Sequence, residues 1–194
     1  MTNPLTPIGR ISFPKLLGEP KLNSMSGKKE FSVDLLFEKN EDISILKAEL
    51  DKAIAGKWGA KPPKGLRSPI KDGDGVKFQS GEPFGPEYHG HYFITLKNTR
   101  RPSVVDNLKQ PIIAEEELYG GCYGRASFNA FAYEKAGNKG VSFSLVNFQK
   151  VKDGEPFGSA TRATAETEFD VIDEEVDNEA NYAPAPVKKK SILG

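Results

Sequence analysis

The 194 residues, with 37% hydrophobic and 28% charged side chains and a net charge of zero, are enough for one folded domain and an additional segment. Twelve Phe and six Tyr against two Met and one Trp favour a β-rich fold, and nineteen Gly and fourteen Pro predict many turns. The single cysteine, Cys122, excludes an internal disulfide and a cysteine-based zinc site, and the chain has no membrane-spanning apolar run and no signal-peptide pattern, so we expect a cytoplasmic protein.

The N-terminal part predicts two strands. Residues 1–9 have the composition of a loose leader, and residues 10–14 predict a short strand that Pro14 ends or confines to an edge. Residues 29–37 predict a longer strand, because their apolar side chains alternate with polar ones at Phe31, Val33, Leu35 and Phe37.

One substantial helix follows. Asn40 or Asp42 can cap it, and the chain then carries apolar residues at helical spacing up to about Trp58 (Ile43, Leu46, Leu50 and Ile54). Gly59 comes directly after this segment, as is typical of a helix end.

Residues 60–87 predict a long loop, because Pro and Gly recur in it and its basic residues outnumber its acidic ones. Loops of this length in a compact domain are usually functional or mobile. Asp72 and Asp74 flank a glycine, which is ordinary turn chemistry, but together with the glutamates at 115–117 they leave open a metal-dependent nuclease. Since no catalytic triad or nucleotide-binding glycine motif is present, the sequence favours no enzyme, no cofactor and no metal site.

Residues 88–97 predict the next strand. A basic turn with Arg100 and Arg101 follows it, and residues 103–106 predict a short strand. Side chains alternate along a strand, and this places Tyr92, Ile94 and Leu96 on one face and His91, Phe93, Thr95 and Lys97 on the other.

Residues 119–150 are the most informative stretch. Two arms rich in aromatic and β-branched residues flank residues 134–140, which predict a hairpin loop of several residues. One face of the first arm is small and mostly apolar and should pack on the core (Cys122, Gly124, Ala126, Phe128, Ala130 and Ala132). The other face mixes rings with a guanidinium and amides (Tyr123, Arg125, Ser127, Asn129, Phe131 and Tyr133).

The last residues differ in composition from the rest. Eight acidic and no basic residues lie between Glu166 and Glu179, and three lysines follow, so residues 166–194 carry −5 and residues 1–165, with 24 basic and 19 acidic groups, carry +5. This predicts a folded domain over residues 1–159 and a disordered acidic tail with a basic end over residues 160–194. Such a charge split suggests a polyanionic partner, although an acidic tail can serve solubility alone.

Together these elements predict a mainly β protein with an OB-fold, a five-stranded antiparallel Greek-key barrel with one substantial helix and long loops. Rings beside cationic groups on such a sheet suit the stacking of unpaired bases and the binding of their phosphates. We predict phosphate contacts from Lys97, Arg100, Arg101 and Arg125. We predict stacking by Phe93, Tyr123, Phe131 and Tyr133, with Tyr88 and Tyr92 behind them. A protein-binding β-module, in which the same rings meet another protein, is the remaining alternative.

Five segments, in this order and spacing, resemble the tailed-bacteriophage single-stranded DNA-binding proteins. They are residues 88–93 (Tyr-His-Gly-His-Tyr-Phe), 101–106 (Arg-Pro-Ser-Val-Val-Asp), 119–127 (Tyr-Gly-Gly-Cys-Tyr-Gly-Arg-Ala-Ser), 140–145 (Gly-Val-Ser-Phe-Ser-Leu) and 153–158 (Asp-Gly-Glu-Pro-Phe-Gly). The resemblance spans about residues 8–160.

The resemblance implies an OB-fold that coats single-stranded DNA in phage replication and recombination, in the cytoplasm of the host cell. It also implies an acidic C-terminal tail that recruits replication proteins and competes with DNA for the groove. Such tails often finish on acidic residues and an aromatic residue. This chain finishes Lys188-Lys189-Lys190-Ser-Ile-Leu-Gly194, which departs from that pattern.

Overall fold

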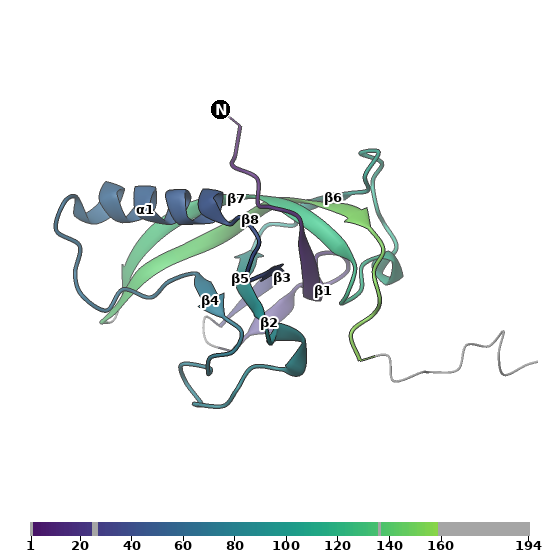
Figure 1. Cartoon of the computed structure of the whole chain (residues 1–194). Coiled ribbons are helices and arrows are strands. Elements are labelled where there is room, and N and C mark those ends of the chain that lie inside the picture. The colour runs from purple at the N-terminus through teal and green to yellow at the C-terminus, as the bar shows by residue number, and fades with distance from the viewer. Residues whose placement is uncertain (1, 25–26, 136, 159–194) are drawn as a thin grey trace, which may run out of the picture. The chain divides into compact units, whose positions relative to one another are not determined.

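The computed structural model describes residues 2–24, 27–135 and 137–158 (Figure 1). In chain order the elements are β1 (Gly9–Lys15), β2 (Lys21–Asn23), β3 (Lys28–Glu38), α1 (Ser44–Trp58), β4 (Ile70–Asp72), the 3₁₀ turn η1 (Pro86–Tyr88), β5 (His91–Asn98), β6 (Ser103–Val105), the 3₁₀ turn η2 (Glu115–Glu117), β7 (Tyr123–Lys135) and β8 (Asn138–Lys152). No helix in these described ranges is long and apolar enough to cross a membrane. The predicted tail, residues 160–194, lies outside them.

Five of the strands form a ring of pairings. β3 pairs antiparallel with β1 and β5, and β7 pairs antiparallel with β1 and β8. β5 meets β8 in parallel through one residue pair, Lys97 with Ser144, so the ring is only narrowly joined there. The order β1–β3–β5–β8–β7 confirms the predicted mainly β class with five principal strands. The short strands β2, β4 and β6 extend the sheet at β3, β5 and β8.

The core lies inside this ring. The alternation predicted for residues 29–37 is confirmed, because Phe31, Val33, Leu35 and Phe37 are all buried, and the last three belong to the main hydrophobic cluster. The same cluster takes in Phe128 and Phe143 from the hairpin, whose ring centroids are 4.9 Å apart. Phenylalanine rings from β3, β7 and β8 therefore fill the ring interior.

Helix α1 lies along the β7–β8 hairpin (Figure 1). The N-cap is Ile43, so the prediction of Asn40 or Asp42 at this position is wrong by at least one residue; the Asp42 carboxylate nevertheless accepts a hydrogen bond from the Ser44 amide at 2.8 Å and so satisfies one donor of the first turn. Gly59 follows the last residue, Trp58, with φ 62°, a conformation that glycine adopts without strain. The helix packs its apolar side on the core through Leu46 and several partly buried residues (Leu50, Ala53, Ile54 and Trp58).

Several segments differ from the sequence-based expectation. The loop predicted over residues 60–87 contains the short strand β4. The leader is not loose, because the Thr6 amide donates to Ala126 O at 2.9 Å and the Ala126 amide donates to Thr6 Oγ1 at 3.0 Å. The strand expected from Tyr88 begins only at His91, after a glycine at φ 75°. The predicted loop over residues 134–140 is almost all strand, since its residues stay paired up to Lys135 with Asn138.

Candidate nucleic-acid interface

The outer face of β1, β3 and β5 consists of three rows of cross-strand neighbours. Residues paired directly across strands carry their side chains on the same face, about 5 Å apart. The register gives the rows as Arg10, Leu36 and Phe93; Ser12, Asp34 and Thr95; and Lys15, Ser32 and Lys97. We call Leu36 and Phe93, with the side chains of Phe84 and Tyr88 that pack on them, the covered half, and the row of Lys15, Ser32 and Lys97 the open half.

In the covered half, aromatic side chains from the loop before β5 lie over the sheet. The ring centroids of Tyr88 and Phe84 are 4.6 and 4.9 Å from that of Phe93. Only 2% of Phe93 and 5% of Tyr88 is exposed. The predictions that these two rings are presented for stacking are therefore wrong. Alternation identified the face of Phe93 correctly, but it carries no information about a loop that covers that face.

A hydrogen bond holds this cover on the sheet. The Tyr88 hydroxyl donates to Asp34 Oδ2 at 2.6 Å. Burial raises the pKa of Asp34, while hydrogen bonds from Tyr88 and Thr95 oppose this effect. Burial also raises the pKa of Tyr88, and the neighbouring Asp34 carboxylate adds to the rise. The loop before β5 is thus tied to β3 by a polar contact as well as by ring packing.

Lys71 lies at the border between the two halves. Its Nζ donates to Thr95 Oγ1 at 3.3 Å and lies 5.1 Å from the centroid of the Phe93 ring. Burial of the ammonium lowers the pKa of Lys71; Asp34 opposes this shift, and the charge of Lys97 adds to it. Two lysine side chains are therefore close enough to repel each other, and an anion placed between them would relieve that repulsion.

The open half presents lysines whose ion pairs are long. Lys97 Nζ is 3.8 Å from Glu30 Oε2, and Lys15 Nζ is 3.8 Å from Glu115 Oε2. Both separations exceed hydrogen-bonding distance. Partly exposed pairs of this kind contribute little to stability, so the ammonium groups can turn to another anion at small cost.

The open half continues onto the hairpin, because Lys97 pairs with Ser144 of β8 and Ser144 pairs with Asn129 of β7. Phe131 lies two residues further along β7 on the same side and is 48% exposed, and half-buried Tyr133 follows. The predicted face assignment of this strand is confirmed, because the opposite face is buried or partly buried (Cys122, Gly124, Ala126, Phe128, Ala130 and Ala132). Lys97, Phe131 and Tyr133 are thus predicted residues that share one accessible face.

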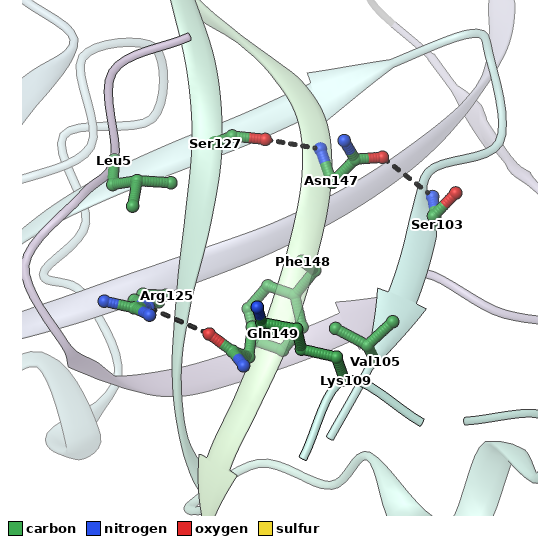
Figure 2. Close-up of a pocket in the computed structure, with 9 residues that line it drawn as sticks. All are labelled: Leu5, Ser103, Val105, Lys109, Arg125, Ser127, Asn147, Phe148 and Gln149. Atoms are coloured by element: carbon green, nitrogen blue, oxygen red, sulfur yellow. Dashed lines mark hydrogen bonds between the residues drawn. The ribbon is translucent and has the colours of Figure 1, made fainter. Parts of the chain in front are cut away.

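Tyr123 and Arg125 lie on a different part of β7. Arg125 Nε donates to Gln149 Oε1 at 3.0 Å, and Lys152 Nζ lies 4.5 Å from the centroid of the Tyr123 ring. Arg125 lines a shallow cavity of about 340 Å³ over β6, β7 and β8 (Figure 2), together with Leu5, Ser103, Val105, Lys109, Ser127, Asn147, Phe148 and Gln149. Four residues of strand, about 13 Å, separate Arg125 from Asn129 and the open half.

The remaining predicted residues do not join this face in the same way. The Arg101 guanidinium donates to Gly18 O at 2.6 Å and lies 5.3 Å from the centroid of the Phe31 ring, so it is engaged by the loop after β1 and by β3. Arg100 is exposed beside it. Tyr92 is partly buried against the main core, which makes its predicted role in stacking wrong, because it shares the inward face of β5.

The carboxylates proposed for a nuclease site already have a cation. Lys39 Nζ lies 2.9 Å from Asp72 Oδ1 and 2.5 Å from Asp74 Oδ2. Its hydrogen bond, with one from the Gly90 amide, lowers the pKa of Asp74 to about 2. Within the described ranges, no group of three or more His, Cys, Asp and Glu side chains is placed to hold a metal ion. The Asp pair therefore serves as a turn anchored to Lys39.

Two exposed phenylalanines were missed. Phe13 is 69% exposed on β1, and Phe78 is 80% exposed in the loop before β5, where the Arg67 guanidinium lies 4.2 Å from its ring centroid. The Phe13-Pro14 pair could have indicated an irregular strand, since proline interrupts a ladder. Nothing in the turn-rich composition around Phe78 marks its ring as exposed.

Comparison with known proteins gives matches over most of the chain. A family model described as Enterobacter phage Enc34, ssDNA-binding protein, matches residues 5–181. The chain is 31% identical over 173 residues to protein p50 of Acyrthosiphon pisum secondary endosymbiont phage 1, which covers 83% of this chain and 89% of that protein.

Two solved structures are also similar. The single-stranded DNA-binding protein from bacteriophage Enc34, in complex with ssDNA, is 25% identical with a TM-score of 0.64, over 79% of this chain and 88% of that one. The protein gp2.5, a single-stranded DNA-binding protein encoded by bacteriophage T7, is 12% identical with a TM-score of 0.55, over 82% of this chain and 97% of that one, which shows a shared fold alone.

Proposed function

This chain belongs to the family of the Enterobacter phage Enc34 ssDNA-binding protein, and from that premise we propose that it binds single-stranded DNA along the open half and the adjoining face of the hairpin. The observation that carries the proposal is the row of Lys15, Ser32 and Lys97, which stays uncovered while Leu36 and Phe93, two rows away on the same face, are buried. Phe131 extends this row with an exposed ring. The face of β3 and β5 is also the one that OB-folds generally use for oligonucleotides.

The proposed mode of binding tolerates any base sequence. Lysine ammonium groups bind phosphates, which are the same in every nucleotide, and rings stack on bases, which all have a π-face. Stacking contributes about 1–3 kcal/mol per base. Since a ring can stack only on a base that is not already paired and stacked in a duplex, unpaired strands are the expected substrate. Coating of single-stranded intermediates in phage replication and recombination is the role that fits this binding.

We assign no catalytic role to the chain. The Asp72 and Asp74 carboxylates are engaged by Lys39, which leaves them poorly placed to take a metal ion. Arg125, Arg100 and Arg101 remain predicted phosphate contacts outside the proposed path.

The acidic segment between Glu166 and Glu179 would act as a competitor of DNA. It has eight carboxylates and no basic residues. The carboxylates are therefore attracted to the same lysines that bind phosphate. When DNA displaces the segment, it becomes available to basic surfaces of replication proteins. Removing residues 160–194 should therefore tighten DNA binding, and more at low salt than at high salt.

Titration of a labelled oligo-dT and of a duplex of the same length, each at two salt concentrations, tests the proposal. We expect tighter binding of the single strand and a loss of affinity with salt. If Lys15, Lys71 and Lys97 each neutralise one phosphate, their share of the slope of log K against log salt is about −2. Equal affinity for both nucleic acids, or no binding of either at low salt, would refute the proposal, and in the second case a tight protein complex would favour the protein-binding module.

A further inference from the structure

Phe13 occupies an irregular position in β1. Ser12 pairs with Asp34 and Lys15 pairs with Ser32, so two residues, Phe13 and Pro14, stand opposite the one residue between those partners. This is a β-bulge, in which an extra residue changes the direction of a side chain. In a regular ladder the residue after Ser12 would face the core, as Ile11 does. Phe13 instead is 69% exposed.

The backbone of Phe13 is in the left-handed region, with φ 44°. A bulky residue with positive φ is strained, and such residues persist where the surrounding structure imposes them, often at functional sites. The ring does not repay this strain by packing, because most of its surface is in solvent. The bulge therefore presents an aromatic ring outward at a cost to folding.

The position of the ring relates it to the proposed DNA path. Lys15, two residues along the same strand, belongs to the open half, and Ser32 and Lys97 follow it across β3 and β5. Three adjacent strands span two inter-strand spacings of about 4.8 Å each. Phe13 thus stands at the β1 side of a row that has Phe131 beyond its other side.

We infer that Phe13 stacks on a base of bound single-stranded DNA and fixes one end of the path across the open half. This inference rests on the proposed function. An exposed ring beside cationic side chains can stack on any base while the lysines bind the phosphates. The bulge supplies what a regular strand could not, namely an outward ring between two residues, Ser12 and Lys15, that both pair with β3.

The test uses the full chain and oligo-dT, with wild type, Phe13→Leu, Phe13→Tyr and Ile113→Ala compared at one salt concentration. Leucine keeps an apolar side chain and the backbone strain but has no π-face, so Phe13→Leu should weaken binding by about 5- to 100-fold. Phe13→Tyr should bind within about twofold of wild type, since it keeps the ring. Ile113→Ala removes another exposed apolar side chain, from the loop between β6 and η2 rather than from the sheet, and should leave affinity unchanged.

A further variant, Phe13→Gly, separates binding from folding. Glycine accepts a positive φ without strain, so its Tm should be no lower than that of wild type while its affinity falls as in Phe13→Leu. If wild type binds oligo-dT and Phe13→Leu binds equally well, the inference is overturned while the proposed function stands. A Tm several degrees lower for Phe13→Gly would also overturn it, because the ring would then be structural. If wild type itself does not bind oligo-dT, the proposed function is refuted, and the inference about Phe13 is refuted with it.

Discussion

Phe93 and Lys97 lie four residues apart on the same strand and point to the same side of the sheet, yet they have opposite surroundings. Phe93 is closed off by Tyr88 and Phe84, whereas Lys97 remains accessible beside a long ion pair with Glu30. The strand itself is equivalent at both positions, so the difference comes from the loop before β5, which reaches the first row and stops before the third.

This contrast separates two uses of one sheet face. The covered half acts as a second, smaller core that fixes a long loop, and the open half is left for a ligand. An aromatic residue on the outward face of an OB-type sheet is therefore not by itself a stacking residue; its exposure decides. The predictions below test that division, from the largest expected effect to the smallest.

Phe93→Ala should give the largest change. Removing a fully buried ring from the covered half should lower the free energy of unfolding by about 3–5 kcal/mol, measured by urea denaturation. The matched variant Phe131→Ala removes an exposed ring from the hairpin face and should cost less than about 1 kcal/mol. Equal losses in the two variants would show that the distinction between the halves is wrong.

Tyr88→Phe should destabilise the fold by about 1–3 kcal/mol at neutral pH, because it leaves the buried Asp34 carboxylate without its hydroxyl donor. The hydrogen bond favours the ionised form of Asp34, so the contribution is present above the raised pKa of that group and is lost as the pH falls through it. The free energies of unfolding of wild type and variant should therefore differ at neutral pH and become equal at acid pH. A deficit that does not change with pH would contradict the assignment.

Lys97→Ala should change DNA binding rather than folding. Loss of one phosphate contact should make the slope of log K against log salt shallower by about 0.7, with the free energy of unfolding within about 0.5 kcal/mol of wild type. Lys47→Ala removes the same charge from an exposed site on α1 and should leave the slope unchanged. An identical slope for the Lys97 variant and wild type would remove Lys97 from the path.

Asp74→Asn should have the smallest effect. Asp74 and Asp72 hold Lys39 at the base of the covering loop, and the pKa of Asp74 is lowered to about 2. A depressed carboxylate pKa gives stability that is present above about pH 4 and is lost as the pH falls towards 2. The small difference in Tm between wild type and variant should disappear over that range. A difference in Tm that grows on acidification would contradict a stabilising ion pair between Asp74 and Lys39.

The periodicity of apolar residues was enough to predict the faces of the main strands and the helix, but not which aromatic rings are exposed. Alternation at Phe31, Val33, Leu35 and Phe37 and the two faces around Phe128 and Phe131 were predictable, because a strand that covers a core must bury every second side chain. Helix α1 and its Asp42 contact followed from spacing and capping chemistry. These are local rules, and the structure obeys them.

The failures arise where a distant segment decides the outcome. Tyr88 and Phe93 were expected at the surface, but each buries the other through a loop contact that no local pattern encodes. The exposure of Phe13 was not predicted for the opposite reason. A bulge turns this residue outward, although its place in a regular strand would face the core. The exposure of a ring depends on tertiary packing, whereas alternation along a strand predicts only the face of the sheet on which the ring lies.

Photo-crosslinking of bromodeoxyuridine-containing oligo-dT to the full chain, with the adducts located by peptide fragmentation, tests the central claim most directly. If the open half and the adjoining hairpin face bind DNA, adducts should form at Phe13 and Phe131 and be absent from Phe93 and Tyr88. Adducts confined to the residues around Arg125 (Leu5, Val105 and Gln149), with none at Phe13 or Phe131, would place the DNA at the cavity over β6, β7 and β8 and contradict the account.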